Sequence, residues 1–171
     1  MFWKLLKLLL VLLMVASFAV LLKGAVGRAS TGISQPIAFN HLAHTKTAEL
    51  ECDVCHRYVK EQEFAGCPER EICAACHESP LTESAAEATL LEYLKSGKSI
   101  PWRRLYDIPD HVYYSHRRHV TVAKLDCSEC HGPIGQSTTP PEAPLKTISM
   151  ALCTSCHEKQ NVSVDCNGCH R

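Results

Sequence analysis

Ten of the eleven cysteines in this 171-residue chain fall into five boxes of identical spacing. In each box two residues separate the cysteines, and a histidine follows the second cysteine directly. In chain order, first to fifth, the boxes are Cys52/Cys55/His56, Cys73/Cys76/His77, Cys127/Cys130/His131, Cys153/Cys156/His157 and Cys166/Cys169/His170. This CxxCH spacing is the attachment signature of a c-type haem: the thiols form thioethers with the macrocycle and the histidine binds its iron. The boxes therefore predict five covalently bound haem c groups.

Five further histidines lie outside the boxes, so spare histidines and boxes are equal in number. Each iron needs a second axial ligand, and methionine is the main competitor of histidine for that position. Beyond the N-terminal segment the chain has only Met150, so at most one haem is of the His/Met type. We expect bis-histidine ligation from the five spare histidines, which are His41, His44, His111, His116 and His119.

Two other uses of paired cysteines fit the sequence less well. Zinc ribbons contain CxxC units, but they do not require a histidine directly after every second cysteine. A disulfide framework is disfavoured by the odd number of cysteines and by the uniform following histidine. The eleventh cysteine, Cys67, is either buried and inert or a thiol open to an intermolecular bond.

Residues 39–56 are repeated, at an offset of 75 positions, by residues 114–131. Each copy has an aromatic residue, the pattern His-x-x-His, seven further residues and then a box. If the His-x-x-His segment is helical, its two histidines lie on one side of a turn. The repeat extends over residues 37–77 and 112–157, and a further box follows at residues 166–170. Its unit is a haem site.

The chain opens with an apolar segment that runs unbroken from residue 8 to residue 22. Residues 5–22 would form about 27 Å of helix, close to the roughly 30 Å hydrocarbon core of a membrane. We expect residues 1–29 to be a transmembrane signal-anchor and tether. Residues 30–171 would then lie on the periplasmic, extracytoplasmic side of the inner (cytoplasmic) membrane. The alternative is a cleaved signal peptide with a small-x-small site at residues 17–19.

For the haem domain the sequence predicts a mostly irregular fold with few α-helices. One helix is clearly marked, since Ser84 and Glu87 form a capping box and Gly97 suits the position after its last turn. This helix either covers a haem or docks a partner, or it packs on the domain as a plain spacer. Prolines predict an extended segment over residues 100–111 and a surface loop over residues 132–146. Because apolar periodicity is scarce elsewhere, we expect the haems to supply the core and the haem-free chain to be unfolded.

The charge of the chain points to no nucleic-acid partner. Lys+Arg and Asp+Glu balance at 18 each. Bare charge therefore predicts neither nucleic acid nor a strongly acidic partner.

The pattern aromatic-x-His-x-x-His followed by a box resembles the class III cytochromes c, which are compact bis-histidine multihaem proteins. With its five boxes and N-terminal anchor, the chain is similar to the membrane-anchored pentahaem subunit of alternative complex III. It is also similar to the multihaem subunit of related menaquinone reductase complexes. The resemblance implies an electron carrier without enzymatic chemistry of its own. Its partners would be a quinone-binding membrane subunit, an iron–sulfur/molybdopterin-like subunit and another cytochrome.

The resemblance also implies axial pairs. In the class III pattern the first histidine of a pair ligates the haem of the box that follows. His41 would therefore serve the haem of His56, and His116 that of His131. The second histidines, His44 and His119, would serve later boxes and leave His111 for another. Which of the second, fourth and fifth boxes each of these takes stays open.

The leading interpretation is thus a membrane-anchored pentahaem electron relay in a quinol-linked respiratory complex. Bis-histidine ligation favours lower potentials than His/Met ligation and leaves no iron position for a substrate. A quinol-oxidising cytochrome that feeds a periplasmic reductase and a soluble multihaem shuttle are the alternatives. A reductase of nitrite or hydroxylamine would need an open or lysine-ligated iron, and the chain has no CxxCK box.

Overall fold

The computed structural model describes residues 32–171 together with Trp3, Lys7 and Met14. The chain divides into two compact units, Met1–Gly32 and Ile33–Arg171. The expected transmembrane segment within residues 1–29 lies outside the described residues, apart from the three just named. None of the helices in the described part is long and apolar enough to cross a membrane. All of the sites below belong to the second unit.

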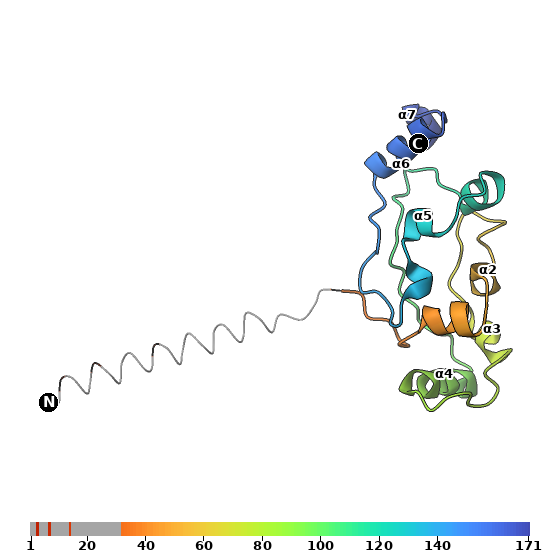
Figure 1. Ribbon diagram of the computed structural model, residues 1–171, viewed down its shortest axis with the longest axis vertical. Coiled ribbons are helices and arrows are strands. Elements are labelled where there is room, and N and C mark those ends of the chain that lie inside the picture. The colour runs from red at the N-terminus through yellow and green to blue at the C-terminus, as the bar shows by residue number, and fades with distance from the viewer. Residues whose placement is uncertain (1–2, 4–6, 8–13, 15–31) are drawn as a thin grey trace. The chain divides into compact units, whose positions relative to one another are not determined.

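Short helices joined by irregular segments make up this second unit (Figure 1). In chain order they are η1 (Ala43–Thr47), α2 (Cys52–Cys55), α3 (Arg70–Ala74), α4 (Ala85–Ser96), η2 (Arg117–Val122), α5 (Ser128–His131), η3 (Ile134–Gln136), α6 (Met150–Lys159) and α7 (Cys166–Cys169). The described residues contain no named strand, and an isolated antiparallel bridge joins Val112 to His170. The helix-poor, mostly irregular domain expected from the sequence is confirmed.

Helix α4 occupies the segment that the sequence marks. The Ser84 side chain accepts a hydrogen bond from the Glu87 backbone N–H at 3.1 Å. Gly97 ends the helix at a φ of 70°, a left-handed conformation that favours glycine. The capping box is only half formed, however, because the Ser84 N–H donates to the Thr82 hydroxyl at 3.3 Å. The Glu87 carboxylate is engaged elsewhere, as described below.

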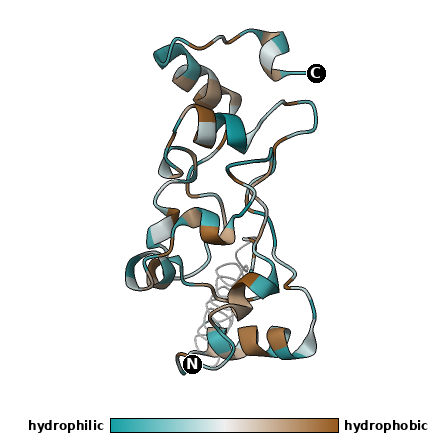
Figure 2. Cartoon of the chain, turned by 90° about the vertical axis from the view of Figure 1, so that its right-hand side faces the viewer, coloured by the Kyte–Doolittle hydropathy of each residue, from teal (hydrophilic) through white to brown (hydrophobic). Residues whose placement is uncertain are grey.

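Few apolar side chains of the described part are deeply buried. Ile37, Leu90 and Ile100 are 5–8% exposed and form one cluster beneath α4, with Trp102 packed against it. Val59 is buried separately, at 8% exposure. In Figure 2 the hydrophobic colour is accordingly scattered in short stretches along the ribbon. Protein side chains alone therefore provide only a small core.

The two copies of the repeated pattern adopt the same local structure. Ala48 and Ala123, which occupy equivalent positions, each donate a hydrogen bond to the carbonyl five residues earlier, at 3.0 Å in both cases. This is the hydrogen bond of a π-helix, so the histidine pairs lie on π-helical turns rather than α-helical ones. The next residues, Glu49 and Lys124, also match, with φ values of 54° and 57°.

Each of these turns is held by the segment that follows the box of the other copy. The Leu42 N–H donates to the Ser137 carbonyl, and the Arg117 N–H donates to the Gln62 carbonyl, both at 3.1 Å. Leu42 corresponds to Arg117, and Gln62 to Ser137, at the same offset of 75 residues. Because the contact runs in both directions, an approximate two-fold axis relates the two copies, as in an isologous dimer.

Two threonines repeat this exchange with their side chains. The Thr45 hydroxyl donates to the Gly135 carbonyl at 2.7 Å, and the Thr121 hydroxyl donates to the Lys60 carbonyl at 2.6 Å. The π-helical turns are thereby fixed against the opposite copy, which sets the positions of their histidines.

Candidate haem sites

Every box lies on a helical turn. In four boxes the histidine N–H donates to the carbonyl of the first cysteine at 2.9 Å, namely in the first, second, third and fifth. The fourth box lies inside α6. Because residues three and four apart share a helix face, both thiols and the histidine of each box emerge on the same side. This is the arrangement that two thioethers and one axial ligand on a single macrocycle require.

Four box histidines face a spare histidine. The distances between ring centroids are 6.2 Å for His44–His77, 6.3 Å for His116–His131, 6.3 Å for His119–His157 and 5.6 Å for His111–His170. Two imidazoles that bind one metal ion from opposite sides, each at about 2 Å, place their centroids about 6 Å apart. The ring pairs therefore fit bis-histidine coordination of an iron.

The remaining spare histidine, His41, lies near the remaining box histidine, His56. Burial, followed by the charges of His56 and His44, lowers the pKa of His41 to about 4. Burial is also the main cause that lowers the pKa of His116 and of His131. These rings are consequently neutral at physiological pH, which is the form that binds a metal.

Backbone carbonyls fix the tautomers of several rings. The Nδ1 atoms of five histidines lie 2.8–3.1 Å from carbonyl oxygens: His44, His56, His116, His119 and His157. A carbonyl only accepts, so Nδ1 carries the proton and Nε2 presents its lone pair. The Nδ1 atom of His41 lies 3.2 Å from the Ser137 hydroxyl. Hydrogen bonds of this kind orient a metal-binding imidazole and raise its basicity.

The aromatic residue of each repeat packs against both of its histidines. Phe39 stacks on His44 with centroids 4.4 Å apart, and Tyr114 stacks on His119 at 4.8 Å. Each also stands edge-on to the first histidine of its repeat, at 4.8 and 5.0 Å. Burial, with smaller contributions from nearby thiols, raises the pKa of Tyr114 to about 12. The aromatic position of the pattern thus holds the two imidazoles apart.

The second box has an ionised partner. Glu87 Oε1 lies 2.7 Å from His77 Nδ1 and accepts from the Leu81 N–H at 2.9 Å. Its other oxygen accepts from the Thr82 N–H and hydroxyl at 2.6 and 2.5 Å. Hydrogen bonds, first from the Thr82 side chain and then from Leu81, lower the pKa of Glu87 to about 2. The carboxylate is 6% exposed and charged.

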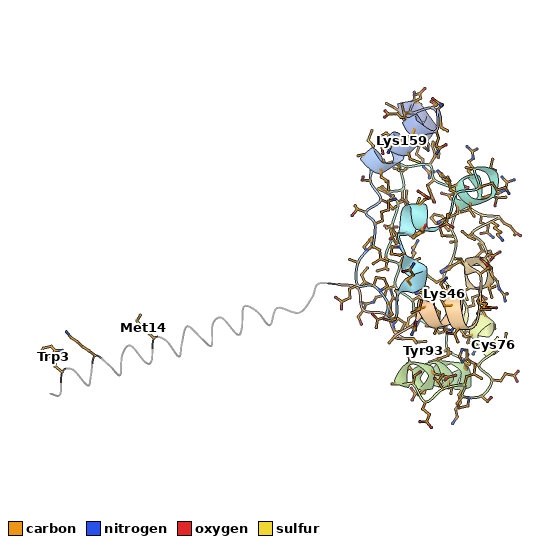
Figure 3. The ribbon with its side chains drawn as sticks, in the orientation of Figure 1. Trp3, Met14, Lys46, Cys76, Tyr93 and Lys159 are labelled. Atoms are coloured by element: carbon orange, nitrogen blue, oxygen red, sulfur yellow. The ribbon has the colours of Figure 1, made fainter. Side chains whose placement is uncertain are left out.

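Electrostatic influences between thiols indicate which boxes are neighbours. Burial is the main cause that raises the pKa of several thiols, and a cysteine of another box adds to it: Cys76 at Cys55, Cys52 at Cys127, Cys156 at Cys130 and Cys169 at Cys153. The boxes therefore form a row in the order second, first, third, fourth, fifth. Figure 1 shows α3 and α4 at one end of the unit and α7 at the other, and Figure 3 shows Cys76 and Lys159 near these opposite ends.

The approximate two-fold axis passes between the first and third boxes of this row. Cys52 and Cys127 are equivalent residues of the first and third boxes, and they lie against each other; burial, followed by Cys52, raises the pKa of Cys127 to about 11. Two equivalent residues can touch only close to the axis that relates them. The second and fourth boxes then take equivalent places on either side.

Comparison with known proteins identifies the family of the chain. Residues 22–100 match the class III cytochrome C family, and residues 112–171 match the family described as cytochrome c7 and related cytochrome c. The menaquinone reductase, multiheme cytochrome c subunit of Nitratidesulfovibrio vulgaris Hildenborough is 33% identical over 145 residues, which cover 74% of this chain and 69% of that protein. The chain belongs to the class III and c7 multihaem cytochromes c. It is an electron carrier rather than an enzyme, and its family binds haem c covalently.

The fifth box of the cytochrome is attached to the row by backbone pairing. The Tyr113 N–H donates to the Cys169 carbonyl at 2.8 Å, and the Arg171 N–H donates to the His111 carbonyl at 3.0 Å. The Arg171 guanidinium also lies 4.9 Å from the Tyr113 ring centroid. These contacts bring together His111 and His170, two residues that the sequence analysis does not pair.

Sequence reasoning misses the groups that orient the imidazoles. From the sequence, Glu87 is interpreted only as part of a helix cap. Three of these groups are backbone carbonyls. Gly66 accepts from His56, Glu63 from His116 and Ser163 from His157. A backbone carbonyl leaves no trace in residue type, so no sequence signal could have found these three. An acid ten residues after a box histidine is the one signal that Glu87 offers.

Proposed function

We propose that the cytochrome carries five haem c groups, one on each box, each held by one box histidine and one spare histidine. The axial pairs are His41/His56, His44/His77, His116/His131, His119/His157 and His111/His170. The observation that carries this proposal is the set of four facing ring pairs with centroids 5.6–6.3 Å apart. When bound, each haem supplies an iron that takes up and releases one electron between its ferrous and ferric states.

The chain's own residues supply a fixed and saturated coordination environment. Two imidazoles per site would hold the iron from both sides, which would leave no position for a substrate. The Nδ1 hydrogen bonds hold the imidazole rings in one orientation. A ligand set that does not rearrange suits a protein whose task is to pass electrons on.

The row of boxes supports a role as a relay between partners. The second box and the fifth box stand at its two ends, while the first and third lie in the middle. Partners that deliver and remove electrons would dock at the two ends.

We further propose that the cytochrome is a subunit of a membrane-bound, quinone-linked respiratory complex of the alternative complex III or menaquinone reductase type. A relative that is 33% identical is itself a menaquinone reductase subunit, which supports this assignment. The apolar run of residues 8–22 would anchor the chain in the inner membrane. Residues 30–171 would face the extracytoplasmic side, and the partners would be a quinone-binding subunit, an iron–sulfur/molybdopterin-like subunit and another cytochrome.

Haem content and ligation are tested on the full chain produced with a c-type haem maturation system. We expect the intact mass to equal that of the polypeptide with five haems. We expect the optical and EPR spectra to be entirely low-spin, with no binding of carbon monoxide. Clearly fewer than five haems, or a major five-coordinate species, would contradict the proposal.

Membership of a complex is tested by purifying the tagged cytochrome from native membranes in mild detergent and identifying the accompanying subunits. We expect co-purification with quinone-linked partners. A variant lacking residues 1–29 behind a cleavable signal peptide should be released into the soluble extracytoplasmic fraction. Recovery of the intact cytochrome as a lone soluble monomer would contradict the complex assignment.

A further inference from the structure

We propose that Glu87 is a positioning residue that makes the iron site of the second box more reducing than its two-fold counterpart at the fourth box. This inference rests on the proposed ligation of the second site by His44 and His77. It assigns to α4 a task beyond packing: the helix delivers a buried negative charge to one axial ligand.

The surroundings of the Glu87 carboxylate make it a hydrogen-bond acceptor toward His77. Two backbone N–H groups and the Thr82 hydroxyl surround it, at 2.5–2.9 Å, and it is 6% exposed. These donors keep the carboxylate ionised, and an ionised carboxylate only accepts hydrogen bonds. His77 must therefore donate its Nδ1 proton across the 2.7 Å contact. This leaves the Nε2 lone pair of His77 free and directed away from Glu87. The ring centroids of His77 and His44 lie 6.2 Å apart.

The counterpart of this contact at the fourth box is chemically different. His157 lies 6.3 Å from His119, and this ring pair corresponds to His77 and His44 by the approximate two-fold relation. The Nδ1 atom of His157 donates to the neutral backbone carbonyl of Ser163 at 3.1 Å. Two sites with the same ligand types, related by the approximate two-fold axis, therefore differ in the acceptor behind the box histidine.

The difference has a predictable sign. A carboxylate draws the Nδ1 proton toward itself more strongly than a neutral carbonyl does, because the hydrogen bond is charge-assisted. The imidazole becomes a stronger electron donor at Nε2, and a stronger donor stabilises the ferric state over the ferrous state. Second-shell hydrogen bonding to an axial histidine is one of the ways in which a protein sets a reduction potential. The one-electron couple of the second site is thus lowered.

The two copies of the repeat are thus alike in structure but differ in the reduction potential of one haem site. Reciprocal contacts hold the two copies of the repeat alike, including Leu42 to Ser137 and Arg117 to Gln62. The α4 segment, residues 85–96, lies in the first copy's half of the chain and brings Glu87 to its outer box. Glu87 therefore makes the second box more reducing than the fourth, which favours electron flow from the second box along the row toward the fourth.

Glu87→Gln in the full-length holoprotein tests the inference by spectroelectrochemical redox titration and EPR. The substitution keeps the shape of the side chain but removes its charge. We expect one of the five one-electron transitions to move to a more positive potential, together with a change in the EPR g-values of that single low-spin species. The other four transitions should stay in place. Glu92→Gln is the matched control, since Glu92 is an exposed carboxylate on the same helix, and it should move none.

A second variant separates tuning from folding. Thr82→Val removes the hydroxyl that donates to Glu87 Oε2. The carboxylate, with fewer donors, becomes a stronger acceptor for His77, so the same transition should move to a more negative potential. Opposite shifts from the two variants are not expected of a merely structural role. If Glu87→Gln fails to retain its haems, the Thr82→Val variant tests the inference alone. A shift to a more negative potential supports the role of Glu87, and a shift to a more positive one contradicts it.

Intact mass is measured first for each protein, so that this inference and the proposed function can fail separately. A wild-type protein without five low-spin haems contradicts the proposed function. Five low-spin haems, with every transition unmoved by Glu87→Gln or with Thr82→Val shifted in the positive direction, overturn the role of Glu87.

Discussion

The imidazoles of this cytochrome are prepared for metal binding by their neighbours. A carbonyl or carboxylate behind Nδ1 places the proton on that nitrogen and leaves the Nε2 lone pair free to bind a metal. Burial acts in the same direction, and together with the charges of His56 and His44 it lowers the pKa of His41 to about 4. Orientation and protonation state are therefore both set by the polypeptide.

His44 provides a direct test of the proposed pairing with the second box. In His44→Ala, one site keeps a single axial imidazole, so one high-spin haem that binds carbon monoxide should appear while four stay low-spin. EPR and carbon monoxide difference spectra measure this. Lys46→Ala changes an exposed side chain on the same π-helical turn and should leave all sites low-spin. A wholly low-spin His44→Ala protein with five haems would contradict the pairing.

For single residues, the sequence indicates which side chains could hold haems, but it predicts poorly which of them meet in space. The CxxCH spacing and the equality of boxes and spare histidines indicate which residues could hold haems. They leave open the partners of His44, His119 and His111, because those depend on how segments far apart in the chain meet. Glu87 shows the same limit: local spacing predicts a bond back to Ser84, but the carboxylate instead bonds His77 and the loop at Leu81 and Thr82.

Among the elements, α4 was predictable and the π-helical turns were not. The start of α4 after Ser84 and its end at Gly97 follow from local side-chain and backbone chemistry, which a sequence displays. The π-helical turns contain local bonds too, such as the one that the Asn40 side chain accepts from the Ala43 N–H at 2.9 Å. Each turn is in addition fixed by bonds to the opposite copy of the repeat, as at Thr45 and Thr121, and these tertiary contacts are not visible in the local sequence.

The exchanged threonine bonds should contribute equally to stability if the two copies brace each other. Thr45→Val and Thr121→Val each remove a hydroxyl that donates to a carbonyl of the other copy. Each change should lower the free energy of unfolding by about 1 kcal/mol, the usual net value of one hydrogen bond. Guanidinium unfolding of the holoproteins, followed by far-UV circular dichroism, measures the two losses.

Thr89→Val is the control for these two variants. The Thr89 hydroxyl bonds the Ala85 carbonyl within α4 itself, so its loss breaks no contact between the copies. Of the three variants, Thr89→Val should lose the least free energy of unfolding. A clear loss in only one of Thr45→Val and Thr121→Val would contradict the reciprocal bracing.

For the whole molecule, the small apolar core means that the haems must contribute much of the stability. The most buried apolar side chains of the described part are Ile37, Val59, Leu90 and Ile100. A core of this size is usually supplemented by covalent cross-links or cofactors. Five macrocycles, each attached through two thioethers, would supply both apolar volume and cross-links between segments distant in sequence.

Haem-free chain made in the cytosol should therefore lack a cooperative fold. We expect no sigmoidal unfolding transition by circular dichroism and rapid digestion by a low concentration of protease, in contrast to the holoprotein. The comparison uses residues 30–171 in both states, so that the N-terminal segment does not contribute. A cooperative transition in the haem-free protein would show that side-chain packing suffices.

The order of the boxes predicts how strongly the loss of a single haem weakens the fold. The first box lies in the middle of the row, next to both the second and the third, whereas the fifth box has a neighbour on one side. Cys52→Ala/Cys55→Ala removes attachment at the centre, where the two copies of the repeat meet. Cys166→Ala/Cys169→Ala removes it at an end that backbone pairing with Tyr113 and His111 still holds. Both double variants should lose one haem by mass, but the central one should lose more unfolding free energy in guanidinium. Equal losses would mean that the haems stabilise their own segments independently, and that the row does not act as one cooperative core.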